Sequence, residues 1–81
     1  MRTARVQALA LAAQFAAATR HQPRTDETPK RVRVEVDLPP GLSDQARRTV
    51  LAACAGADRF GHDCTRQGAV VWAELDQRRA K

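Results

Sequence analysis

The sequence predicts a small α+β or α/β domain in which helix, strand, helix and strand follow one another along 81 residues. Three observations predict this order. The chain opens with an Ala- and Leu-rich segment, residues 31–38 alternate between polar and apolar side chains, and a second helical pattern precedes an apolar segment near the end. Because two strands alone make a marginal sheet, we expect two copies to pair edge to edge into four strands, with helices covering one face.

Residues 1–19 are predicted to form an N-terminal helix, because Ala and Leu are strong helix formers and neither Gly nor Pro interrupts them. Its polar stripe holds only Gln7 and Gln14, and apolar side chains cover most of the remaining surface. Such a helix is expected to make contacts on more than one side, either across the seam of a dimer or with another protein.

The same segment has a superficial likeness to a signal peptide, since Arg2 and Arg5 precede its apolar run. Its high Ala content and its two Gln residues make it too weakly hydrophobic for export or for a membrane span. We therefore expect a retained helix in a cytoplasmic protein without a membrane partner.

Residues 20–30 are predicted to be a linker, because they combine two prolines and mixed charge with no large apolar side chain. Residues 31–38 then give the clearest strand of the chain. One face is apolar (Val32, Val34, Val36 and Leu38) and the other is charged (Arg31, Arg33, Glu35 and Asp37). The pair Pro39 and Pro40 ends this strand, because proline cannot donate to the ladder.

A second helix is predicted from Ser43, a natural N-cap, to about Ala57. Residues 58–68 are expected to form a loop and residues 69–76 a second strand, so that 31–76 make a β-α-β core. Trp72 adds apolar surface to the outer face of this strand, and we expect the first helix or a partner to cover it. Both a parallel crossover and an antiparallel pairing of the two strands are compatible with the connection.

The net charge of +5 is unevenly distributed. Residues 1–31 carry an excess of four positive charges, residues 32–57 are neutral, and residues 77–81 form a basic tail. Phosphate binding would therefore use arms and depend strongly on salt. The candidate nucleic-acid contacts are Arg31, Arg33, Arg47, Arg48, Arg78, Arg79 and Lys81.

The only soft metal ligands close together in sequence are Cys54, His62 and Cys64. They are weak candidates, since a structural zinc site takes four ligands and Cys54 falls on the apolar stripe of the second helix. Two cysteines are also too few for a disulfide scaffold, although a pairing of Cys54 with Cys64 is an alternative. No metal, no cofactor and no enzymatic activity is expected.

These observations favour a small non-enzymatic protein-interaction module that forms a homodimer and contacts itself or another protein. A nucleic-acid-associated accessory protein is the alternative, and a thiol or metal site at His62 and Cys64 is a second one. The residues expected at the interaction surface are Val6, Leu9, Leu11, Phe15, Val70 and Trp72.

Overall fold

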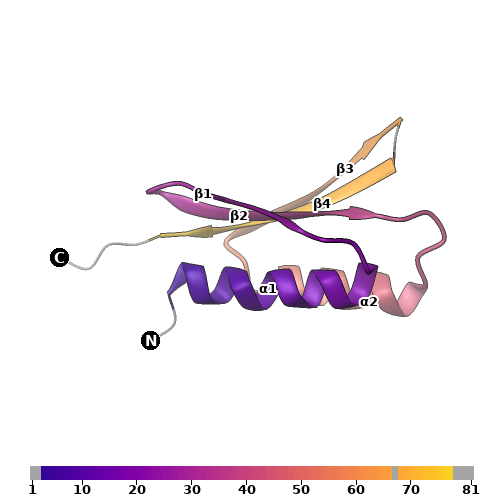
Figure 1. The fold of residues 1–81 in the computed structure, drawn as a ribbon, viewed down its shortest axis with the longest axis horizontal. Coiled ribbons are helices and arrows are strands. Elements are labelled where there is room, and N and C mark those ends of the chain that lie inside the picture. The colour runs from indigo at the N-terminus through magenta and orange to yellow at the C-terminus, as the bar shows by residue number, and fades with distance from the viewer. Residues whose placement is uncertain (1–2, 67, 78–81) are drawn as a thin grey trace.

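Two helices pack side by side on one face of a four-stranded antiparallel sheet in a computed structural model that describes residues 3–66 and 68–77 (Figure 1). The elements are, in chain order, α1 (Ala4–Thr19), β1 (Arg24–Glu27), β2 (Arg31–Leu38), α2 (Asp44–Cys54), β3 (Arg59–Thr65) and β4 (Gly68–Asp76). The strands lie in the order β1-β2-β4-β3. The expected order of helix, strand, helix and strand is thus incomplete. Each of the two expected strands, β2 and β4, forms a hairpin with a strand that was not expected, β1 and β3 respectively.

α1 is held at both ends by its own residues. The Thr3 side chain accepts a hydrogen bond from the backbone N–H of Val6 at 3.2 Å, which supplies an N-terminal donor with an acceptor. At the other end Arg20 adopts a left-handed conformation with φ 61°, and its backbone N–H donates to the carbonyl of Ala16. The face that α1 buries is made by Ala8, Leu11, Phe15 and Thr19.

The expected linker over 20–30 contains β1, which pairs antiparallel with β2. Thr28 closes the turn between them, because its side-chain oxygen accepts from the backbone N–H groups of Lys30 and Arg31. Every residue of β1 is exposed. β1 therefore forms through backbone pairing and not through burial of an apolar stripe, which is why no periodic pattern indicates it.

The alternation in β2 is confirmed. Val32, Val34 and Val36 are fully buried beneath the helices, and their charged neighbours lie on the opposite face. α2 begins as predicted, with the Ser43 side chain accepting from the backbone N–H of Ala46. Its helical turns end at Cys54, three residues before the predicted end.

The expected loop over 58–68 contains β3, which forms a hairpin with β4. β4 pairs with β2 on its other side, and this pairing is antiparallel, which decides between the two alternatives that the sequence allowed. Each chain therefore has four strands of its own, and the expectation of two strands per chain is wrong. The core between sheet and helices contains Phe15, the three buried valines of β2, Val50 and Cys54 of α2, and Val71, Ala73 and Leu75 of β4.

Candidate functional site

The sheet face turned away from the helices is covered by charged side chains. Residues that lie directly opposite each other in an antiparallel pair share a face. The register therefore assigns to this open face Arg24, Asp26, Arg31, Arg33, Glu35, Asp37, Arg59, Gly61, Asp63, Thr65, Val70, Trp72, Glu74 and Asp76. Its six carboxylates and four arginines leave this face net acidic.

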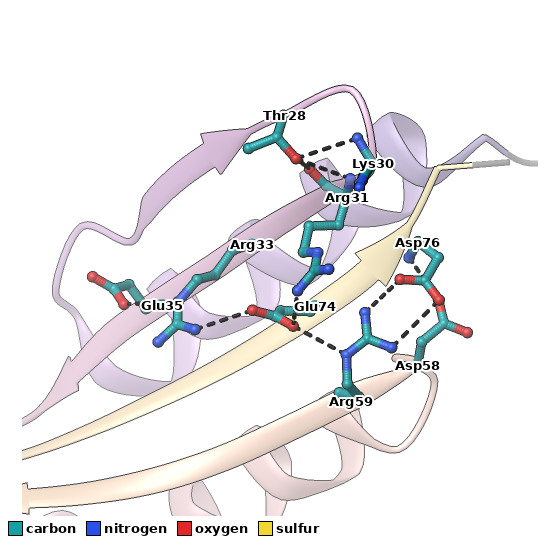
Figure 2. A network of polar contacts seen from close by, with 9 residues as sticks. All are labelled: Thr28, Lys30, Arg31, Arg33, Glu35, Asp58, Arg59, Glu74 and Asp76. Atoms are coloured by element: carbon teal, nitrogen blue, oxygen red, sulfur yellow. Dashed lines mark hydrogen bonds and ion pairs between the residues drawn. The ribbon is translucent and has the colours of Figure 1, made fainter. Parts of the chain in front are cut away.

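Glu74 is the centre of the most connected cluster on this face (Figure 2). Its carboxylate accepts hydrogen bonds from Arg59 at 3.1 Å, Arg33 at 3.1 Å and Arg31 at 3.4 Å, and the residue is only 8% exposed. Hydrogen bonding to Arg59 and Arg33 lowers the pKa of the Glu74 carboxyl, and partial burial opposes the shift. Arg59 also binds Asp76, so that the cluster joins β2, β4 and β3.

A second cluster lies nearer the β1 edge. Arg24 donates to Glu35 at 3.0 Å and to Asp37 at 3.1 Å, and these contacts lower the pKa of both carboxyl groups. Every arginine of the open face is thus bound to a carboxylate. Arg31 and Arg33, expected as nucleic-acid contacts, are bound to Glu74 in this structure.

Trp72 lies at the middle of the open face, on the side opposite to α1. The Arg33 guanidinium lies over its ring, 4.5 Å from the centroid, in a cation–π arrangement. The ring also extends over Gly61 of β3, where an added Cβ would meet Trp72 Cε2 at 2.6 Å and Nε1 at 2.8 Å. Within one chain Trp72 is therefore covered by Arg33, not by the first helix.

The residues of α1 that were expected at an interaction surface differ in their exposure to solvent. Leu11 and Phe15 are buried in the chain's own core, whereas Val6 and Leu9 are 51% and 67% exposed. Val70 is partly buried beside Trp72 on the open face. Only part of the expected surface is therefore available to a partner.

Two further exposed apolar side chains lie on α2 and on β3. Leu51 is 53% exposed and Phe60 is 52% exposed. Phe60 lies on the helix side of β3, the side of its register partner Ala73. Leu51 and His62 line one small pocket of about 110 Å³ between α2 and the sheet. The sequence does not indicate these two residues as interaction residues, because Leu51 lies off the buried stripe of α2 and residue 60 falls in the expected loop.

The candidate thiol and metal residues do not meet at one point. Cys54 is buried in α2, where burial raises the pKa of its thiol, and Cys64 is exposed on β3. Cys64 Sγ lies 3.9 Å from His62 Nε2, which is the long end of the range for a hydrogen bond to sulfur. Among residues 3–66 and 68–77, no group of three or more His, Cys, Asp and Glu side chains is arranged to hold a metal ion.

Three further arginines differ from those of the open face. Arg47 and Arg48 project from α2 and Arg66 follows β3, and none of them makes an ion pair within the described part of the chain. Arg47 and Arg66 line one groove at the end of the β3–β4 hairpin together with His62 and Cys64. The candidate tail contacts Arg78, Arg79 and Lys81 lie outside the described residues.

Within the described residues, neither helix has the length and apolar character needed to cross a membrane. Comparison with known proteins adds no relative: no protein-family model, no curated protein and no solved structure matches this chain.

Proposed function

We propose that this protein is a small non-enzymatic interaction module that works as a homodimer. The observation that carries the proposal is the exposure of four large apolar side chains in a domain of 81 residues. Val6 and Leu9 lie on the outer side of α1, and Leu51 and Phe60 lie at the edge of α2 and β3. Paired apolar exposure of this kind is typical of association surfaces.

One further feature supports this function over catalysis. The four arginines of the open face and four of its six carboxylates are bound to one another in ion pairs, which is the arrangement of a structural surface. The described cysteines are both free thiols, which fits a reducing compartment such as the cytoplasm. We therefore place the module in the cytoplasm.

Light scattering after size exclusion, over a range of protein concentrations and at low and high salt, tests the homodimer. The expected result is twice the monomer mass at high concentration, with little dependence on salt, because apolar contacts are not screened. A monomer mass at every concentration would refute the proposed function.

Binding of nucleic acid is a second candidate, favoured by Arg47, Arg48 and Arg66, which form no ion pair with any residue that the structure describes. These cations lie on α2 and at the hairpin, so phosphate contacts are expected there and not on the net acidic open face. Substitution of Arg47 and Arg48 by Gln should then reduce the slope of the logarithm of the binding constant against the logarithm of salt by about two. An unchanged slope would exclude these two arginines as phosphate contacts.

A further inference from the structure

We propose that two copies of this chain pair antiparallel through the free edge of β3, with Gly61 facing the partner's Gly61. The result is one continuous sheet of eight strands with all helices on one side. The inference rests on the proposed homodimer and adds to it the surface and the register. A second copy is the occupant because the edge is complementary to itself, as the following observations show.

β3 is the longer of the two free edges. It has seven residues and pairs only with β4, whereas β1 at the opposite edge has four residues. An unpaired strand edge presents backbone donors and acceptors that another strand can satisfy. Figure 1 shows that the distal end of the β3–β4 hairpin extends away from the helices, and six of the seven residues of β3 are exposed.

The charged residues of β3 favour one register for the pairing of the two β3 strands. With Gly61 at the twofold axis, Arg59 of each copy lies directly opposite the partner's Asp63, once on either side of the axis. Asp63 makes no ion pair within the described residues, whereas Arg59 already binds Glu74 and Asp76 of its own chain, so the partner's Asp63 would add a third carboxylate to it. Opposite charges at facing positions stabilise paired strands. If His62 were at the axis instead, Asp63 would face the partner's Gly61 and this complementarity would be lost.

The positions of Trp72 and Gly61 on the open face are compatible with the register that places Gly61 at the twofold axis. Trp72 lies beside Gly61 in the sheet, and its ring extends over that glycine toward the free edge. In the dimer the two Trp72 residues and the two glycines form one row across four strands, with Trp72 Cα atoms about 14 Å apart. Because Gly61 has no side chain, the two rings can approach each other above it.

The helix side of the edge supplies the apolar contact. Phe60 would face the partner's His62, and Leu51 on α2 lies on the same side of the sheet. A twofold axis perpendicular to the sheet keeps the helices of both copies on that side. The half-exposed Phe60 and Leu51 therefore become covered where the two α2 helices approach each other.

A charge reversal at the edge tests the pairing. The variant Asp63→Arg places like charges opposite each other at both symmetric positions, and its dimer dissociation constant should rise about tenfold or more. Asp26→Arg is the matched control, because Asp26 is an exposed carboxylate on the same face of the other edge strand. Trp72 is the only tryptophan, so the emission shift on dilution measures both constants, with light scattering as a second readout.

A spin label on the native Cys64 tests the register without changing the edge charges, since Cys54 is buried and should remain unlabelled. The two labelled positions are six residues apart along the paired strands in this register. A dipolar distance of about 20 Å is therefore expected between them, measured on labelled protein whose dimer mass is unchanged.

The outcomes separate the two proposals. A monomeric parent protein refutes the proposed homodimer and with it this inference. A dimer that tolerates Asp63→Arg as well as Asp26→Arg, or that shows a different Cys64 distance, refutes the β3 pairing alone and directs attention to Val6 and Leu9 on α1. A dimer weakened by Asp63→Arg alone, with the expected distance, supports both.

Discussion

Replacement of Glu74 by Gln should destabilise the fold more than any other single charge removal on the open face. Gln has nearly the same shape, but it carries no charge and has only one acceptor oxygen for three guanidinium groups. Glu74 is the one carboxylate of this face that is almost fully buried, and it accepts from Arg31 and Arg33 of β2 and from Arg59 of β3. Its loss therefore acts on the pairing of β2, β4 and β3 together.

The magnitude follows from these contacts. Hydrogen bonds to a charged group contribute about 1.5–3 kcal/mol each when buried, but the three arginines are partly exposed and solvent weakens their attraction. We expect the free energy of unfolding to fall by about 2 kcal/mol in Glu74→Gln. For a domain of this size that loss corresponds to a decrease in Tm of about 10 °C.

The pH dependence gives a second test of the same cause. Because the folded-state pKa of Glu74 is depressed below its ordinary value of 4.5, its contribution is present above that pH and is lost as pH falls through the folded pKa. The gap in stability between parent and variant should therefore be full at pH 7 and should close below pH 4.5.

Urea denaturation followed by circular dichroism, at a series of pH values, measures this gap. Asp26→Asn is the matched control, since Asp26 is exposed and on the same face, and its effect should be within about 0.5 kcal/mol. If Glu74→Gln were as stable as the parent at pH 7, or if the gap did not narrow as the pH was lowered below 4.5, the three arginines would not stabilise the fold through the Glu74 charge.

Three further predictions test other parts of the structure. Gly61→Ala should cost about 1 kcal/mol, because the new methyl displaces the Trp72 ring; the same change in a Trp72→Ala background should cost nothing, and equal costs in both would contradict the contact. Ser43→Ala should cost about 1 kcal/mol in urea denaturation through loss of the α2 cap, a result that an unchanged midpoint would rule out. In thiol labelling of the folded protein Cys64 should react quickly and Cys54 only after unfolding, and simultaneous labelling of both would disprove the burial of Cys54.

The elements that bury one stripe of side chains could be predicted from the sequence. β2 alternates because one of its faces forms the core, and its three valines are fully buried as the pattern indicates. α1 and α2 begin at Thr3 and Ser43 because these side chains accept hydrogen bonds from the first turn. In each case the interaction that stabilises the element is local or periodic, and the sequence alone contains it.

The candidate site was only partly predictable. Trp72 was correctly singled out as apolar surface on the outer side of its strand, but its cover is Arg33, from a strand 39 positions earlier in the chain. Phe60 and Leu51 carry no periodic signal, and their exposure depends on how α2 and β3 are placed in the fold. Contacts between distant segments of this kind do not follow from local pattern.

The two edge strands, β1 and β3, are the elements that the sequence did not predict and that depend on the tertiary structure. The sequence by itself determined both helices, the two central strands and the buried sides of β2 and α2, since burial imposes a period that can be read along the chain. The buried side of α1 has no such period, because apolar side chains cover most of that helix. β1 is entirely exposed and β3 nearly so, and neither has an apolar stripe. They form because the central strands β2 and β4 offer backbone donors and acceptors along their outer edges, and backbone hydrogen bonds place little constraint on the side chains of the strand that satisfies them.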